Sequence, residues 1–200
     1  MLNLRHSQQG VSLVELAIGL VIIGILFAKG VPAFSGWIQN TQIRTAAESI
    51  LNGLQIARAE AVRRNSNVRL SLTNATGTVA WTVDCVTVTA DCPANIQSRS
   101  ANEGGTNARA GISVTALPSP LLANQFNTAL AAGAGLPAGV TFDGIGRVPT
   151  ANIGTDISRI DITNAASASA RRMVIIVGTG GQVRMCDPAL AFATSPQGCS

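Results

Sequence analysis

Gly10-Val11-Ser12-Leu13-Val14-Glu15 opens the stretch that decides the fold, an apolar run interrupted by one carboxylate. Residues 16–28 of this run carry no charge. As a helix, the 18 residues of 11–28 would measure about 27 Å, close to the ~30 Å hydrocarbon core of a bilayer. The stretch therefore predicts a helix that spans a membrane.

Glu15 is the unusual residue of this helix. A carboxylate at the centre of a membrane helix costs ~2.5–3.5 kcal/mol or more, and less near its ends, so it is normally kept for a partner. A secretory signal peptide cut near residues 28–30 has no use for such a charge, and a plain N-terminal anchor leaves it unexplained. Arg5 precedes the span, which predicts that the N-terminal end stays in the cytoplasm while the rest is exported.

A second helical pattern follows the apolar run. Seven apolar residues recur at the helical period and would form one stripe: Ile43, Ala46, Ala47, Ile50, Leu54, Ala57 and Ala61. Arg44–Glu48 and Glu60–Arg64 are i, i+4 pairs on the exposed side. We expect one helix over residues 11–64, whose stripe packs against a sheet.

After Asn65 the apolar residues alternate, as is typical of strands. The expected strands cover residues 68–72, 79–85, 112–117, 140–142, 157–162, 173–177 and 182–186. Turns are expected at 74–77 and 178–181, and residues 116–139 read as a long surface excursion with a short helix at 121–132. One long helix followed by strands predicts an α+β fold.

Composition limits the chemistry of the chain. The formal charge of +4 is too weak to imply a nucleic-acid partner by itself. The only histidine is His6, before the apolar run, so Ser-His and Cys-His catalysis and histidine metal sites are not expected. The glycine-rich residues 178–181 lack the Lys-Ser/Thr of a phosphate loop. We expect no enzyme activity, no cofactor and no metal site.

Four cysteines form two close pairs along the sequence: Cys85, Cys92, Cys186 and Cys199. Of the three possible connectivities we favour Cys85–Cys92 and Cys186–Cys199, because each closes a short local loop. An exported chain can oxidise them, although free buried thiols stay an alternative. Zinc is disfavoured because no C-x-x-C spacing occurs.

The run from Gly10 to Glu15 resembles the class III signal of type IV pilins and type II secretion pseudopilins. The resemblance implies that a prepilin peptidase cuts between Gly10 and Val11 and methylates the Val11 amine. Glu15 then falls at the family's fifth mature position, and Pro32 where many pilins carry a helix-bending proline. Proline removes a helix hydrogen bond, so we expect a bend there.

This resemblance divides the chain into four parts: a leader (1–10), the transmembrane half of the helix (11–32), its amphipathic half (33–64) and a β-rich periplasmic domain (65–200). It also gives Glu15 a partner. In a filament, the Val11 ammonium of one subunit and the Glu15 carboxylate of its neighbour would neutralise each other in a low dielectric, which would favour assembly over the free membrane monomer.

Two further segments resemble the GspH/FimT group of minor pilins and pseudopilins. They are residues 51–62, LNGLQIARAEAV, and residues 140–147, VTFDGIGR; the final hairpin with Cys186 and Cys199 is similar too. The resemblance implies a pilin-like fold and a low-abundance subunit that initiates or caps a type IV pilus or a type II secretion pseudopilus. The implied partners are the prepilin peptidase, other pilins or pseudopilins in a hetero-oligomeric filament, and the inner membrane.

DNA binding is the alternative function. Some FimT members bind DNA for natural transformation through a C-terminal Gly-Arg-x-Arg motif, and the matching window here is Gly181-Gln182-Val183-Arg184. Gln182 replaces the first arginine, which weakens the case. Arg171 and Arg172 would add phosphate contacts, although a solvated strand end is the favoured interpretation.

Overall fold

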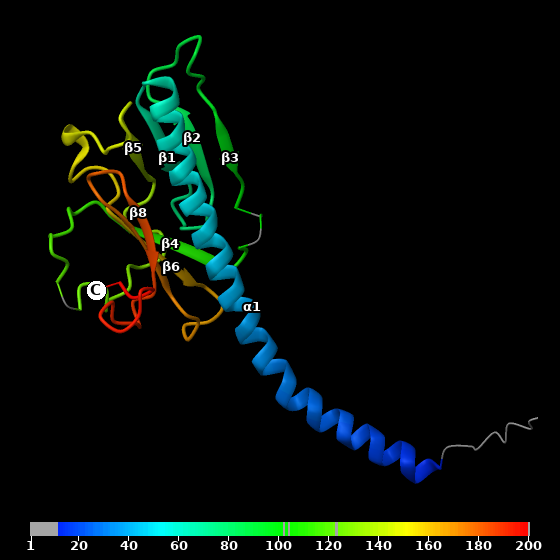
Figure 1. The fold of residues 1–200 in the computed structure, drawn as a ribbon. Coiled ribbons are helices and arrows are strands. Elements are labelled where there is room, and N and C mark those ends of the chain that lie inside the picture. Colours follow the sequence, from blue (N-terminus) through cyan, green and yellow to red (C-terminus); the bar gives the residue numbers. More distant parts are fainter. Residues whose placement is uncertain (1–11, 102, 104, 123, 200) are drawn as a thin grey trace, which may run out of the picture. The chain divides into compact units, whose positions relative to one another are not determined.

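The structure, a computed structural model, describes residues 12–101, 103, 105–122 and 124–199. The chain divides into two compact units, Met1–Trp37 and Ile38–Ser200. In the described residues, the first unit consists of the N-terminal part of helix α1 (Leu13–Arg64), and the second contains the rest of α1 and every strand (Figure 1).

α1 runs without interruption through Pro32. The bend expected at Pro32 stays a prediction. In the second unit, all seven residues of the predicted stripe are at most 2% exposed, so this prediction is confirmed. Both i, i+4 pairs form, with 2.9 Å between Arg44 Nε and Glu48 Oε1 and 2.7 Å between Arg64 Nε and Glu60 Oε2.

The strands in the described residues form two antiparallel sheets of four strands each, in agreement with the expected fold of a long helix packed on an antiparallel sheet domain. The first has the order β3-β2-β1-β5 and the second β4-β6-β7-β8. Their bounds are β1 (Val68–Leu72), β2 (Trp81–Cys85), β3 (Gln97–Arg99), β4 (Ala108–Ser113), β5 (Ala138–Phe142), β6 (Arg159–Asn164), β7 (Met173–Val177) and β8 (Val183–Cys186). A 3-10 turn, η1 (Thr150–Asn152), lies between β5 and β6.

One core joins the C-terminal half of α1 to both sheets. Figure 1 shows this half lying across β1 and β2. The contact is close at Gly53, where an added Cβ would lie 2.6 Å from Leu70 Cδ1. Trp81 fills the space beside it and donates from Nε1 to Ser49 Oγ at 2.9 Å. A larger residue at position 53 would therefore have to displace the Leu70 or Trp81 side chain from the core.

Two sheet edges are covered by other segments of the chain. Along β4, Ala110 donates its N–H to Gly77 O at 2.7 Å and accepts from Gly133 N at 2.8 Å. Along β5, Gly139 O accepts from Ile157 N at 3.0 Å. These bonds satisfy edge groups that would otherwise be open to pairing with another chain.

The structure differs from the sequence-based expectations in four respects. β3 was not predicted, and β4 covers residues 108–113 rather than 112–117. Among the described residues of 121–132 there are turns and bends but no helix. The segment 116–139 is not simply a surface excursion, because Phe126 is 2% exposed and packs with Val174 and the Cys186–Cys199 pair. The turns at 74–77 and 178–181 form as predicted.

Candidate functional site

The N-terminal part of α1 has the composition of a membrane span. An 18-residue window of this helix has a mean hydropathy of 2.2, and none of it is buried inside the molecule. Leu13 is 87% exposed and Phe27 is 67% exposed. Apolar surface of this extent needs a lipid or protein partner to cover it. By length and composition, the helix can cross a membrane.

Glu15 lies exposed in the first turn of α1. The helix N-terminus carries a partial positive charge from its free N–H groups, which favours a carboxylate there. Gly10 and Val11, the expected cleavage and methylation positions, lie outside the described residues. Their roles, like that of Glu15, stay predictions.

Each arginine considered for DNA contact has intramolecular partners. Arg171 pairs with Asp187, and Arg172 pairs with Asp161. Arg184 donates to Gly198 O at 3.0 Å and to Cys199 O at 2.7 Å, and its guanidinium lies 5.2 Å from the centroid of the Phe192 ring. A phosphate would have to compete with these contacts. None of the three arginines is therefore without a partner inside the molecule.

Asp161 is the centre of a buried charge network that the sequence analysis missed. The residue is 0% exposed, and its carboxylate accepts from Arg159 Nε at 2.7 Å and Nη2 at 2.9 Å. It also pairs with Arg172 and accepts from Leu130 N at 3.1 Å. Arg159 and Asp161 lie two residues apart on one face of β6, between buried isoleucines. This spacing was the available sequence signal.

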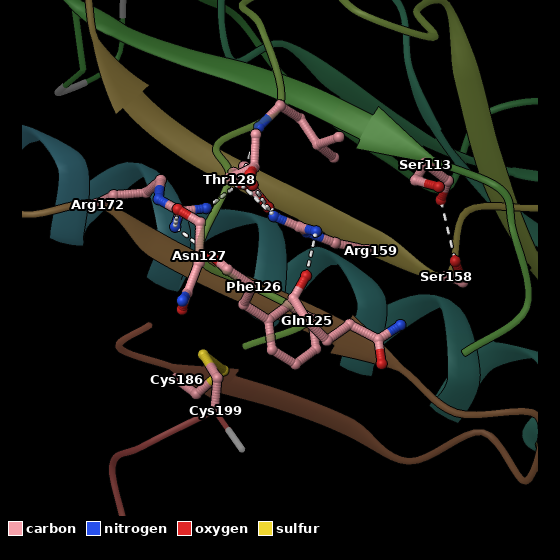
Figure 2. Close-up of polar contacts among 12 residues, drawn as sticks. Ser113, Gln125, Phe126, Asn127, Thr128, Ser158, Arg159, Arg172, Cys186 and Cys199 are labelled. Atoms are coloured by element: carbon pink, nitrogen blue, oxygen red, sulfur yellow. Dashed lines mark hydrogen bonds and ion pairs between the residues drawn. A yellow bond between two sulfur atoms is a disulfide. The ribbon is translucent and has the colours of Figure 1, made fainter. Parts of the chain in front are cut away.

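The network holds the segment 125–130 onto the second sheet (Figure 2). Arg159 donates to Gln125 O at 3.1 Å and to Thr128 O at 2.7 Å, while Arg172 donates to Phe126 O. The Arg159 guanidinium also lies 5.0 Å from the centroid of the Phe126 ring. The two arginines thus satisfy carbonyl groups of a segment without regular structure.

Both favoured cysteine pairs are disulfides in the structure. Cys85–Cys92 closes the loop after β2, and Cys186–Cys199 ties the C-terminal segment to β8. Asp187 donates its N–H to Gln197 O at 2.7 Å beside the second bond. The disulfide and this hydrogen bond together fix residues 187–199.

Two arginines surround Glu60 near the C-terminal end of α1. Arg63 Nη2 and Arg64 Nε each lie 2.7 Å from Glu60 Oε2. Mainly through the Arg63 hydrogen bond, these contacts lower the pKa of Glu60 below its ordinary value of 4.5. Among the described residues, no group of three His, Cys, Asp or Glu side chains could hold a metal ion.

These features define a class of protein. Its members have a long helix whose N-terminal part is apolar and exposed and whose C-terminal part packs on antiparallel sheets. Residues 46–181 match the family described as Type II transport protein GspH, and residues 5–28 match the prokaryotic N-terminal methylation motif. The chain belongs to the GspH family of minor pilins and pseudopilins. This is a family of structural subunits, so the chain is not an enzyme.

Two crystal structures of the type IV minor pilin FimU from Pseudomonas aeruginosa (strain PAO1) are similar to this chain. One, in space group P21, is 15% identical, with coverage of 78% of this chain and 96% of that chain and a TM-score of 0.49. The other, in space group P65, is 16% identical, with coverage of 74% and 95% and a TM-score of 0.46. No curated protein matches the sequence significantly.

Proposed function

We propose that this chain is a minor pilin or pseudopilin that initiates or caps a type IV pilus or a type II secretion pseudopilus. The observation that carries the proposal is the methylation motif over residues 5–28, which leads into an exposed apolar helix with Glu15 in its first turn. The motif implies processing by a prepilin peptidase, and the family implies assembly with other pilins.

The chain would act in two places. Residues 11–32 hold it in the inner membrane, with the domain of residues 65–200 in the periplasm, until a filament incorporates it. In the filament, the apolar surface of α1 would be covered by the helices of neighbouring subunits. The Val11 ammonium exposed by cleavage would pair with Glu15 of a neighbour, because unpaired charges are strongly disfavoured in a low dielectric.

Intact mass and N-terminal sequencing of the membrane-extracted protein test this proposal, with and without the prepilin peptidase. We expect a chain that begins at methylated Val11 only when the peptidase is present. A chain that still begins at Met1 would indicate a plain anchor. A cut near residues 28–30 would indicate a secreted protein, and either result overturns the proposal.

The pilus and the secretion pseudopilus are separated by deleting the gene. Loss of surface pili with intact secretion assigns the chain to a type IV pilus. The reverse result assigns it to a type II secretion system. Whichever phenotype is lost should be restored by the wild-type chain.

DNA binding remains the alternative, but the structure offers no observation that favours it. Arg171, Arg172 and Arg184 are all engaged within the molecule. A salt-sensitive gel shift with the purified full chain would support this alternative, since phosphate contacts weaken as salt rises. We expect no shift at physiological salt.

A further inference from the structure

A small apolar surface with basic neighbours lies near the C-terminal end of α1. We call it the Val62–Ile145 face; it comprises Arg58, Val62, Ile145 and Arg147. Val62 is 51% exposed and Ile145 is 62% exposed. A shallow groove of about 630 Å³ runs beside it along α1 and is lined by Gln55, Arg58, Ala59, Val62 and Arg63.

Hydrogen bonds within the turn fix the side of the face that carries Ile145. Asp143 donates its N–H to Arg147 O at 2.8 Å, and its Oδ1 accepts from Ile145 N at 3.1 Å and Arg147 N at 2.9 Å. The next residue, Gly146, has a φ of +77°, which favours glycine. The exposed Ile145 is therefore presented on a turn that is already ordered.

Contacts on both sides fix the same turn in place. Gly146 O accepts from Arg58 Nε at 3.0 Å. A Cβ on Gly146 would lie 3.1 Å from Val62 Cγ2, so α1 approaches the turn closely. On the other side, a Cβ on Gly181 would lie 1.8 Å from Gly146 O. A preorganised surface of this kind loses little conformational entropy when it binds a partner.

The charge around the face is positive. Among the contacts of the described residues, neither Arg58 nor Arg147 pairs with a carboxylate. Arg63 and Arg64 share the single carboxylate of Glu60, so their two positive charges are only half neutralised by it. Asp143 accepts two N–H groups of its own turn and adds a second negative charge, so the four arginines Arg58, Arg63, Arg64 and Arg147 still exceed the two carboxylates.

We propose that the Val62–Ile145 face docks an acidic segment of a neighbouring, different filament subunit, with apolar side chains on Val62 and Ile145 and a carboxylate facing Arg147. The partner's chemistry follows from charge complementarity around an apolar centre. A nucleic acid fits less well, because its phosphates would leave the two aliphatic side chains uncovered. This inference rests on the proposed function.

Photo-crosslinking of the full chain tests this docking in cells that assemble the filament. A benzophenone amino acid replaces Ile145 in one variant and Ile153 in a matched control, because Ile153 is also exposed, at 41%, on a different turn. Arg147→Glu and Arg147→Lys are each combined with the Ile145 probe. Mass spectrometry identifies the crosslinked peptide, and N-terminal sequencing establishes whether the chain was processed.

We expect an adduct from position 145, and not from 153, with a different chain that itself carries a class III signal and has Asp or Glu in the crosslinked peptide. Arg147→Glu should lower the adduct yield by about tenfold, because it replaces attraction by repulsion, while Arg147→Lys should keep it.

If the chain is processed and present in filaments, several results would overturn the docking inference alone. These are no adduct, equal adduct yields from positions 145 and 153, or no change in yield on Arg147→Glu. An adduct with a second copy of this chain or with nucleic acid would also overturn it. An unprocessed chain absent from filaments would instead overturn the proposed function, and the docking inference with it.

Discussion

Asp161 is fully buried, and its carboxylate faces the guanidinium groups of Arg159 and Arg172. The Asp161→Asn substitution would keep the shape but remove the negative charge, leaving two cations in a poorly solvated site. Loss of one partner from a buried ion pair costs about 3–5 kcal/mol of unfolding free energy. Urea unfolding of the mature chain in detergent, followed by tryptophan fluorescence, measures this loss.

Asp91 provides the matched control for that experiment. It is exposed, and its carboxylate has no ion pair among the contacts of the described residues. Asp91→Asn should change the unfolding free energy by less than about 0.5 kcal/mol. If both variants unfold alike, the network around Asp161 does not stabilise the domain.

Glu60 should make a small contribution to stability that depends on pH. Its pKa is lowered in the folded chain, chiefly by the Arg63 hydrogen bond, so its stabilisation is present above the ordinary value of 4.5 and is lost as pH falls through the lower folded value. At pH 7 the wild type should exceed Glu60→Gln by about 0.5 kcal/mol, typical of i, i+4 pairs. Urea unfolding of both chains at several pH values should show the difference shrinking only at acid pH; a constant difference would contradict the assignment.

At the scale of elements, the C-terminal segment of residues 187–199 depends on one covalent link. Cys186–Cys199 spans 13 residues, and removing such a bond costs about 2–4 kcal/mol because the unfolded chain gains freedom. A variant with Cys186→Ala and Cys199→Ala should therefore be less stable and should lose hydrogen-exchange protection in this segment.

The second disulfide supplies the control for that loss. Removal of Cys85–Cys92, which spans seven residues, should leave the protection of residues 187–199 unchanged. If both variants lose protection there to the same extent, the effect is global unfolding rather than release of the C-terminal segment.

Periodicity predicted the elements whose apolar residues repeat regularly. The stripe on α1 and strands such as Val68–Leu72, whose buried residues alternate, belong to this group. β3 was missed because Gln97-Ser98-Arg99 has no apolar alternation; it is a strand through pairing with β2. The start of β4 was missed because three of its first four residues are alanine or glycine. Gly111 is packed so closely that a Cβ would lie 2.2 Å from Ala131 O, a contact between distant segments.

Only part of the candidate site could be predicted from the sequence. The methylation motif is a local pattern, so it can be read directly from residues 5–28. The Asp161 network joins β6 to residues 125–130 and to Arg172. These segments are distant in the sequence, so a local sequence pattern cannot predict that they are in contact. The alternation of charges with isoleucines in β6 indicated only that the charges share a face.

At the scale of the whole molecule, α1 joins two environments within one continuous helix. Among the described residues none of its apolar window is buried, whereas the C-terminal part packs against the sheets. Glu15 is the only charged residue in the described part of the apolar stretch up to Ala28. Since Glu15 is exposed and lies outside the buried core, a substitution there is expected to leave the core of the domain intact.

Glu15→Ala should separate membrane insertion from assembly. A charged residue is disfavoured in lipid, and in the filament it would pair with the Val11 ammonium of a neighbour. Alanine removes both effects, so the variant should still be membrane-bound and processed to Val11, while its amount in purified filaments falls by about tenfold or more. Glu48→Ala is the control, because Glu48 pairs with Arg44 on the exposed side of α1. Quantitative immunoblots of membranes and filaments measure both pools, and equal incorporation of the two variants would show that Glu15 does not drive assembly.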